Sequence, residues 1–285
     1  MGRTVYLNGE YVAEEEARVS IFDRGFLFAD AVYEVTSVHD GRLLDFPGHM
    51  TRLERSLGIL EIGFEVDRDQ MLAIHRKLVD INNVVEGIVY LQISRGAADR
   101  NFAYPGDEVS PTIVLFTQAR EQLKPKDPAR GIAVITADDL RWHRRDIKTV
   151  QLLYPSMAKM EATRAGADDA WLVEDGEVTE GTSNNAFIVT AEGVIVTRQL
   201  SNDILHGITR AAVLRFAEEA QMRVEERSFT PDEAAAASEA FITSASNYVL
   251  PVVSINGQPI GSGRPGPIAA RLREIYIEES CRQAV

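Results

Sequence analysis

Four two-residue turns constrain the fold of this chain more than any other feature of its sequence. Asn8-Gly9, Asp40-Gly41, Asp175-Gly176 and Asn256-Gly257 each separate short runs in which apolar and polar residues alternate. Asn-Gly and Asp-Gly pairs readily adopt the left-handed backbone of a tight β-hairpin, so each pair predicts two neighbouring antiparallel strands. We therefore expect a protein rich in antiparallel sheet.

Helical spacing of apolar residues appears between the predicted hairpins. The predicted helices span Pro47–Leu60, Arg68–Ile81, Ser156–Gly166, Thr209–Gln221 and Pro265–Glu279. A short helix is also expected after Thr230, which can cap it, with Pro231 in the first turn and Glu233 completing a capping box. Hairpins combined with these helices indicate an α+β fold.

A segment without periodicity divides the chain into two blocks, each of which mixes strands and helices. Residues 122–131 combine prolines and charges and show no apolar repeat. We expect an N-terminal α+β domain over residues 1–121, an interdomain linker over 122–131, and a C-terminal domain over 132–285.

Composition narrows the class of ligand. The formal charge of -13 in 285 residues would repel a phosphate backbone, so nucleic acid is not an expected partner. No signal peptide and no apolar run long enough to span a membrane is apparent, and the single cysteine, Cys281, fits a reducing compartment. These features predict a cytoplasmic protein that binds small molecules.

Two familiar kinds of ligand site are not predicted. The five histidines are scattered without ligand spacing, and one cysteine cannot form a zinc cluster, so we expect no metal site. Gly261 to Gly266 matches the dinucleotide pattern G-x-G-x-x-G but follows a hairpin, and too little chain remains for a βαβ unit. We interpret that segment as a turn before the last helix.

A lysine that forms a Schiff base would have to be one of the five in the chain: Lys77, Lys124, Lys126, Lys148 and Lys159. Four of them are most simply surface charges on a helix or in the linker. Lys148 instead follows a group of arginines and lies where apolar and polar residues alternate. Neighbouring cations and burial disfavour an ammonium group and favour the neutral amine that attacks a carbonyl. The alternative is a half-buried strand lysine paired with Asp146.

Two further segments suggest an anionic, nitrogen-containing ligand. Gly207 directly precedes a predicted helix, whose free N–H groups can hold an anion, and hydroxyls follow an apolar run at Thr243–Asn247. Glu180 lies in a polar loop after a hairpin, where its carboxylate could keep a pyridine nitrogen protonated. A capped helix start, an ordinary turn and a surface acid remain the alternatives.

In combination these segments resemble the aminotransferases of pyridoxal-phosphate (PLP) fold type IV, the family of D-amino acid and branched-chain aminotransferases. The resemblance is carried, in order, by residues 23–34, 49–53, Arg141-Trp142, 146–148, 178–181, Asn184, 207–210 and 241–244. It implies a two-domain α+β fold with PLP in the interdomain cleft, the first domain shaping the substrate pocket and the second holding PLP. It also implies a homodimer. The D-amino acid branch is the most similar.

The resemblance also implies a role for individual residues. Lys148 would carry PLP as a Schiff base and act as the general acid/base, and Glu180 would pair with the pyridine nitrogen. The remaining cofactor contacts would come from Arg52, Leu205, Gly207, Ile208, Thr209, Ser244 and Ala245. The substrate would face Tyr33, Val35, Arg100, Phe102 and Ser246, with Arg100 reaching across the dimer interface.

The sequence departs from this family pattern at Phe102, where D-amino acid aminotransferases commonly have a histidine, and at Ala245, where a threonine is common. The expected activity is transfer of an amino group from a D-alanine-like donor to a 2-oxo acid, by a ping-pong mechanism through pyridoxamine phosphate. The alternatives are an (R)-selective amine transaminase, a branched-chain L-amino acid aminotransferase, an aminodeoxychorismate lyase and a PLP-binding protein without turnover.

Overall fold

The computed structural model describes residues 2–121 and 130–285, so most of the expected linker, with Lys124 and Lys126, lies outside the described residues. The described chain forms two compact units. The first contains residues 2–121, Ile147–Gln151 and Gln283–Val285, and the second contains residues 130–146 and Leu152–Arg282. The expected domains placed Ile147–Gln151 in the second domain. These residues join the first unit because Tyr33 N donates to Lys148 O at 3.0 Å and Val150 N donates to Ala31 O at 3.2 Å.

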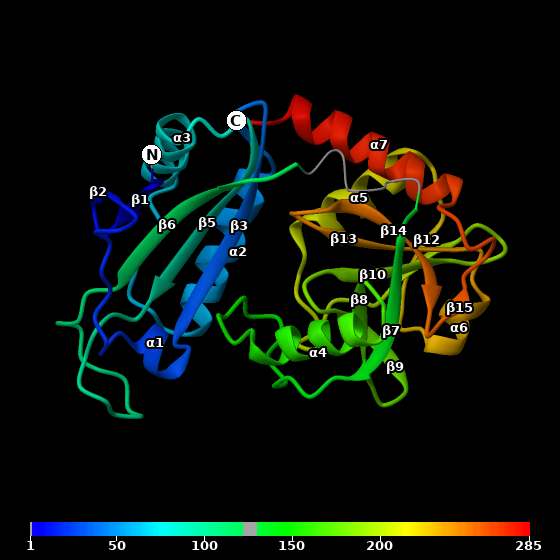
Figure 1. The fold of residues 1–285 in the computed structure, drawn as a ribbon, viewed down its shortest axis with the longest axis horizontal. Helices are drawn as coiled ribbons and strands as arrows, with labels where there is room; N and C mark the ends of the chain where they lie inside the picture. Colours follow the sequence, from blue (N-terminus) through cyan, green and yellow to red (C-terminus); the bar gives the residue numbers. More distant parts are fainter. Residues whose placement is uncertain (1, 122–129) are drawn as a thin grey trace. The chain divides into compact units, whose positions relative to one another are not determined.

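The first unit is built on a six-stranded sheet with the order β2-β1-β6-β5-β3-β4 (Figure 1). Its strands are β1 (Thr4–Leu7), β2 (Glu10–Ala13), β3 (Ala31–His39), β4 (Arg42–Leu43), β5 (Glu86–Ser94) and β6 (Thr112–Ala119). Every pairing in this sheet is antiparallel, as the hairpin signals predicted. Helix α1 (Arg24–Phe28), which the apolar spacing did not predict, is capped by the Asp23 side chain.

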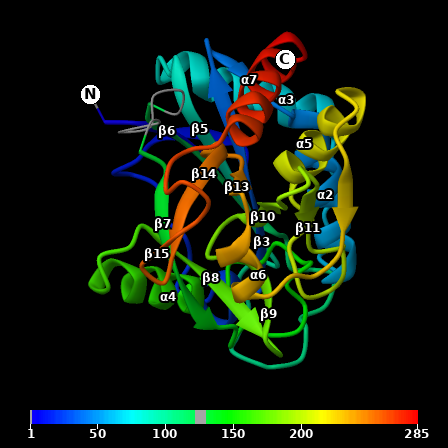
Figure 2. The same ribbon diagram turned by 90° about the vertical axis from the view of Figure 1, so that its right-hand side faces the viewer.

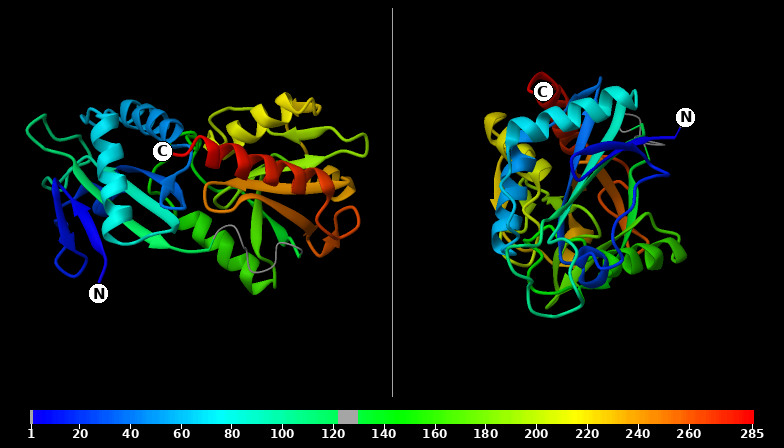
Figure 3. Two further views of the ribbon diagram at one scale, coloured as in Figure 1. Left: turned by 90° about the horizontal axis from the view of Figure 1, so that it is seen from above. Right: turned by 90° about the vertical axis from the view of Figure 1, so that its left-hand side faces the viewer.

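Two longer helices, α2 (Phe46–Ile59) and α3 (Arg68–Ile81), pack against the first sheet (Figure 3). Their apolar positions, among them Met50, Leu53 and Leu78, share one core with the buried strand residues Val32 and Leu91. Helix α3 has the predicted bounds, and Asp67 caps it by accepting from Asp69 N and Gln70 N. This packing fixes the side of the sheet on which α2 side chains meet β3.

The second unit contains a nine-stranded sheet in which the order is β12-β11-β10-β13-β14-β7-β8-β9, with β15 beside β14. The strands are β7 (Ile132–Asp138), β8 (Asp169–Glu174), β9 (Glu177–Gly181), β10 (Asn185–Val189), β11 (Ile195–Thr197), β12 (Val224–Glu226), β13 (Glu239–Ser244), β14 (Tyr248–Ile255) and β15 (Gln258–Pro259). Strand β7 pairs in parallel with both β8 and β14, and β11 pairs in parallel with β12. The local turn signals did not predict these parallel pairs, because a parallel pair needs a long crossover connection and no tight turn.

Four helices accompany this second sheet: α4 (Leu153–Arg164), α5 (Ile208–Glu219), α6 (Pro231–Ala236) and α7 (Pro267–Arg282). Figure 2 shows α7 beside β13 and β14, against which it packs. Thr230 caps α6 by accepting from Glu233 N at 3.1 Å, as predicted. The predicted capping box is not completed, because the Glu233 carboxylate accepts from Arg227 at 2.6 Å and 3.1 Å instead of from Thr230 N. Helix α4 begins three residues earlier than predicted and forms the crossover between β7 and β8. Within the described residues, every helix is too short or too polar to traverse a lipid bilayer.

All four predicted hairpins are confirmed. The first residue of each turn has a positive φ, at 49° for Asn8, 48° for Asp40, 52° for Asp175 and 50° for Asn256. The glycine that follows each of them also has a positive φ. The turns join β1 to β2, β3 to β4, β8 to β9 and β14 to β15. Two consecutive left-handed residues match the twist of the strands they connect.

Candidate functional site

Lys148 lies in an irregular segment that is bonded to β3 and α2 of the first unit. Its carbonyl accepts from Tyr33 N, and its N–H makes a long hydrogen bond of 3.4 Å to Ser56 Oγ of α2. The Nζ atom lies 4.2 Å from the centroid of the Tyr33 ring. Asp146, the partner that the alternative interpretation assigned to Lys148, pairs with Arg144 Nε at 3.0 Å instead. Lys148 is therefore held by its backbone, while its amine lies against an aromatic ring.

Tyr33 and Val35 occupy one face of β3, because alternate residues of a strand point to the same side. Both are half-buried, and the Tyr33 ring stacks on Tyr90 of β5 with centroids 5.6 Å apart. Tyr90 in turn stacks on Phe116 of β6 at 4.7 Å. Burial raises the pKa of the Tyr90 hydroxyl, which donates to Gln92 Oε1 and stays protonated. This row of aromatic rings gives the predicted substrate-facing residues an apolar and rigid base.

Arg52 is held by a buried carboxylate on the other face of β3. Its Nε and Nη2 donate to Glu34 Oε1 and Oε2 at 2.8 Å and 2.7 Å. His49 Nδ1 lies 2.8 Å from Glu34 Oε2. Burial raises the pKa of Glu34, but the Arg52 charge and the hydrogen bonds outweigh it and lower the pKa to about 2. Ser56 lies one helical turn after Arg52, so the same face of α2 carries Arg52 and contacts Lys148.

Arg100 and Phe102 form a separate group with Phe28 of α1. The Arg100 guanidinium lies 5.5 Å from the Phe28 ring centroid and 5.4 Å from that of Phe102. Phe102 is 78% exposed. Among the described residues of this unit, no hydrogen bond or ion pair joins this group to Lys148 or Tyr33. The predicted carboxylate-binding arginine therefore sits on an exposed aromatic surface.

Glu180 of β9 is the centre of the candidate site in the second unit, and it is 4% exposed. Its Oε1 accepts from Arg141 Nη1 at 2.7 Å, and its Oε2 accepts from Leu205 N at 3.0 Å and Asn185 Nδ2 at 3.1 Å. A carboxylate offers about four acceptor positions. These three bonds leave Oε1 able to accept one more hydrogen bond, such as that of a protonated ring nitrogen.

Helix α5 begins without a side-chain cap, as expected for an anion site. Its N-cap residue is Gly207, whose conformation is extended, and no described residue accepts from the N–H groups of Ile208 and Thr209. A Cβ atom at Gly207 would lie 2.0 Å from Asn185 Oδ1, so the glycine permits a close approach. Asn185 Nδ2 also donates to Leu205 O at 3.0 Å. Asn185 thereby links the carboxylate of Glu180 to the start of α5.

The turn that contains Ser244, Ala245 and Ser246 connects β13 to β14. Asn185, the first residue of β10, pairs with Thr243 at the end of β13, so this turn and the start of α5 lie at the same end of the unit. Arg273 of α7 fixes the far side of the turn by donating to Asn247 O at 2.7 Å and Val249 O at 2.8 Å. Hydroxyls and backbone N–H groups at one end of a sheet suit a phosphate.

The residues present fit PLP. The second unit combines a helix start with free N–H groups, a glycine that a Cβ would obstruct, and a buried carboxylate with an unused acceptor position. These features match a phosphate group and a protonated pyridine nitrogen. The first unit adds an amine next to an aromatic ring. In the first unit, Lys148 lies against Tyr33, Arg52 is bound to Glu34 on the opposite face of β3, and Arg100 and Phe102 form a third group.

The arginines near Lys148 in sequence have other partners. Arg145 donates to both oxygens of Glu174 at 2.7 Å and 2.8 Å, and Arg141 binds Asp139 as well as Glu180. Sequence reasoning assigned no role to Arg141 or Asn185, although both adjoin or belong to the segments that carry the family resemblance. The available signal was their position in the sequence: Arg141 is in one of those segments, and Asn185 directly follows Asn184. What they bind depends on residues distant in the sequence.

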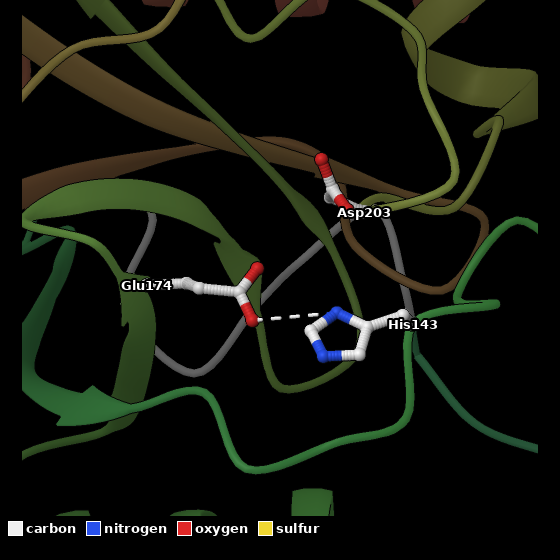
Figure 4. Close-up of side chains that lie close together, drawn as sticks. All are labelled: His143, Glu174 and Asp203. Atoms are coloured by element: carbon white, nitrogen blue, oxygen red, sulfur yellow. Dashed lines mark ion pairs between the residues drawn. The ribbon is translucent and has the colours of Figure 1, made fainter.

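One cluster has side chains of the types that ligate metals. His143, Glu174 and Asp203 have ligand atoms within 4.8 Å of one another, and His143 Nδ1 lies 3.7 Å from Glu174 Oε1 (Figure 4). Glu174 is already bound by Arg145 through both oxygens, and Arg198 Nη2 lies 3.5 Å from Asp203 Oδ2. A metal ion would have to displace these guanidinium groups, so the cluster does not supply free carboxylates.

Comparison with known proteins adds to this geometry. Residues 31–255 match the family model described as amino-transferase class IV. The chain is 41% identical over 269 residues to a D-alanine aminotransferase of Bacillus licheniformis, which covers 94% of each chain. It is 37% identical over 278 residues to a D-alanine aminotransferase of Staphylococcus aureus (strain MSSA476), covering 96% of this chain and 98% of the relative.

Solved structures show the same fold. A T.th. branched-chain amino acid aminotransferase with pyridoxamine 5'-phosphate has a TM-score of 0.88 and 27% identity, covering 98% of this chain and 94% of the other. The Escherichia coli branched-chain enzyme has a TM-score of 0.89 at 22% identity, covering 98% and 95%. The predicted α+β fold of type IV is therefore confirmed. This chain belongs to the class IV aminotransferases, which are PLP-dependent enzymes.

Proposed function

We propose that this enzyme transfers an amino group from a D-alanine-like amino acid to a 2-oxo acid. The observation that carries the proposal is identity of 37% and 41% to two D-alanine aminotransferases over 94% to 98% of each chain. An amine beside an aromatic ring and a carboxylate with an unused acceptor position are the groups that such an enzyme needs.

Two residues carry the chemistry in this proposal. Bound PLP supplies an electron sink for the negative charge that develops at the substrate α-carbon. Lys148 Nζ would hold the cofactor and, as a free amine, would accept and return the proton of the substrate Cα. Glu180 Oε1 binds the ring nitrogen. Support for these roles comes from the position of Nζ at 4.2 Å from the Tyr33 ring and from the three bonds that orient Glu180.

Phosphate binding is proposed for one further set of residues, and Leu205 is proposed to pack against the ring. The set consists of Arg52, Gly207, Ile208, Thr209, Ser244 and Ala245. The uncapped start of α5 supports it, since free N–H groups and the positive end of a helix favour an anion. Glu34 fixes the orientation of the Arg52 guanidinium through two bonds, so the cation is held in place before the phosphate arrives.

Substrate binding is proposed for Tyr33, Val35, Arg100, Phe102 and Ser246. Arg100 binds the substrate carboxylate from the partner subunit of a homodimer, because a guanidinium can hold a carboxylate through two hydrogen bonds. The aromatic rings of Phe28 and Phe102 hold this guanidinium by cation–π contacts at 5.5 Å and 5.4 Å. They also make the neighbourhood of the carboxylate more apolar.

That apolar neighbourhood favours a second candidate activity, transamination of (R)-amines that lack a carboxylate. A branched-chain L-amino acid donor is a third candidate, because the structural neighbours at 27% identity are branched-chain aminotransferases. We further propose a cytoplasmic location, for which the acidic composition and the single cysteine are the support.

Half-reactions of the purified PLP form with single donors test the proposal. We expect D-alanine to bleach the cofactor absorption band, and L-leucine and (R)-1-phenylethylamine to react more slowly. Bleaching by the amine and not by D-alanine would reject the amino acid assignment, and preference for L-leucine would select the branched-chain activity. Pyruvate release from aminodeoxychorismate without an amino acceptor would instead identify a lyase.

Borohydride reduction followed by peptide mapping tests the shared premise about the lysine. We expect the reduced cofactor on the peptide that contains Lys148, and no trapping in Lys148→Ala. Lys159→Ala is the matched control, because its side chain is 48% exposed and pairs with Asp169 at 3.2 Å. Trapping on Lys159, or on no lysine, would overturn the assignment.

A further inference from the structure

Arg141 holds the oxygen of Glu180 that has an unused acceptor position. Its Nη1 donates to Glu180 Oε1 at 2.7 Å, while Leu205 N and Asn185 Nδ2 occupy Oε2. Arg141 is itself fixed by Asp139, to which its Nε and Nη2 donate at 2.9 Å and 2.6 Å. Asp139 also accepts from Thr179 Oγ1 at 2.7 Å. Arg141 and Asp139 therefore link the Glu180 carboxylate to the Thr179 hydroxyl of β9, in addition to the bonds from Leu205 N and Asn185 Nδ2.

The charges around Arg141 do not balance. Three carboxylates, those of Asp139, Glu174 and Glu180, meet two guanidinium groups, those of Arg141 and Arg145. Four of these side chains are at most 12% exposed, and the fifth, that of Glu174, is 21% exposed. Counted over carboxylates and guanidinium groups, without the exposed His143 that lies 3.7 Å from Glu174, the cluster has one excess negative charge and gains from a further cation. A protonated ring nitrogen at Glu180 Oε1 would supply that positive charge.

The location of the proton between a carboxylate and a pyridine nitrogen depends on the environment of both bases. A guanidinium at 2.7 Å donates a charge-assisted hydrogen bond to Glu180 Oε1, and this bond is strongest when the negative charge is on the acceptor and the proton is on the ring. Burial alone would lower the pKa of Arg141, but the charges of Glu180 and Asp139 raise it above its ordinary value. Arg141 therefore keeps its charge at any pH at which the protein is folded.

We propose that Arg141 is a positioning residue for the transaminase reaction, which acts through Glu180 to keep the proton on the ring nitrogen of the cofactor. The inference rests on the proposed function, in which Glu180 pairs with that nitrogen. Without the guanidinium, the proton moves toward the carboxyl group of Glu180. The neutral ring is then a weaker electron sink, and proton removal at the substrate α-carbon slows.

Arg198 provides a matched control. Its side chain has the same exposed fraction as that of Arg141, 12%, and it also pairs with two carboxylates, Glu177 at 3.3 Å and Asp203 at 3.5 Å. Arg198 makes no bond to Glu180 among the described residues. Replacing either arginine removes a partly buried ion pair, but only the Arg141 replacement changes the surroundings of the Glu180 carboxylate.

The test measures the ¹⁵N chemical shift of the ring nitrogen in holoenzyme loaded with ¹⁵N-labelled PLP, which reports protonation without turnover. We expect the shift of a protonated ring in the unaltered enzyme, Arg198→Gln and Arg141→Lys. In Arg141→Gln the shift should move toward that of the unprotonated ring. Loss of the outer partners that orient metal ligands typically costs about 10- to 100-fold in activity. We expect kcat of Arg141→Gln to fall by a similar factor and kcat of Arg141→Lys to be largely retained.

The outcomes separate this inference from the proposed function. A protonated ring in both the unaltered enzyme and Arg141→Gln, or equal shifts in Arg141→Gln and Arg198→Gln, would overturn the role of Arg141 and leave the transaminase assignment intact. An unprotonated ring in the unaltered enzyme would overturn the role of Glu180 itself. If Arg141→Gln fails to fold, Asp139→Asn with Arg141→Gln removes both charges of the pair, and the same change in shift is expected.

Discussion

Two buried titratable side chains of the first unit, Glu34 and His75, have lowered pKa values for different physical reasons. Glu34 has partners for its charge, and its pKa is lowered to about 2 although burial raises it. His75 of α3 is fully buried, and burial lowers its pKa to about 4. Its Nδ1 bonds to Met71 O at 2.7 Å, and its Nε2 has no hydrogen-bond partner in the described structure. The pH dependence of folding follows from these two environments.

The Glu34→Gln substitution is expected to remove an acid-sensitive part of the stability. The folded-state pKa of Glu34 lies below its ordinary value of 4.5, so its contribution is complete above pH 4.5 and is lost as the pH falls toward 2. The shift corresponds to about 3 kcal/mol in the free energy of unfolding. Urea unfolding of the apoenzyme at pH 7 and pH 3 should detect about 2 kcal/mol of it, because the pH 3 sample is still above the folded-state pKa. Equal losses in the unaltered protein and the variant between these pH values would contradict the prediction.

The His75→Leu substitution is also expected to remove an acid-sensitive loss of stability, but at higher pH than Glu34→Gln. Burial depresses the pKa of His75 from 6.5 to about 4, so the unfolded chain binds the proton first and stability falls as the pH drops from 6.5 to 4. Leucine removes that loss, about 3 kcal/mol, together with an unsatisfied nitrogen. Thermal unfolding of both proteins at pH 7 and pH 4.5 checks this. A variant that loses as much stability on acidification as the parent would refute it.

At the scale of elements, the residue that can occupy the start of α5 depends on the side chain of Asn185 in β10. Gly207 leaves the first N–H groups uncapped, and Asn185 of β10 occupies the space that a side chain at 207 would need. The same asparagine bonds to Glu180 and to Leu205 O. Helix, strand and carboxylate are therefore coupled through one side chain.

A Gly207→Ala substitution tests this coupling. The added Cβ would lie 2.0 Å from Asn185 Oδ1, so Asn185 or the helix start must move. We expect PLP to bind about tenfold more weakly, a loss of about 1.4 kcal/mol, as measured by titration of the apoenzyme. Gly58→Ala is the control, because this exposed glycine near the end of α2 has open space around it, and alanine there should leave PLP binding unchanged. Unchanged PLP affinity in Gly207→Ala would contradict the coupling.

At the scale of the whole molecule, the first unit exposes large apolar side chains on two segments, 21–28 and 97–102, which the Asp23–Ala97 bridge and the Phe28–Phe102 ring contact bring together. Ile21, Phe26 and Phe102 are 70%, 75% and 78% exposed. Exposed apolar side chains in such a group favour an interface, and closed homodimers are the commonest assembly. This supports the proposal that Arg100 serves the site of the partner subunit.

Mixed dimers provide the corresponding test. Arg100→Ala and Lys148→Ala should each be nearly inactive, but a dimer with one chain of each kind regains one complete site. Random mixing makes about half of the dimers hybrid, so coexpression should restore about a quarter of the parental activity if the sites are shared in this way. No recovery, together with a hybrid dimer confirmed by native mass spectrometry, would show that Arg100 serves its own chain.

Local chemistry in the sequence by itself determined the four hairpins, the bounds of α3 and the N-cap of α6, because turn dipeptides, apolar spacing and capping side chains act within a few residues. It also singled out Lys148 among five lysines and Gly207 before a helix. Only the tertiary structure decided that Arg141 binds Glu180, 39 residues away, that Arg52 binds Glu34, and that β7 pairs in parallel with β8 and β14. Such contacts depend on which strands and helices become neighbours when the core is buried, and a local pattern does not carry that information.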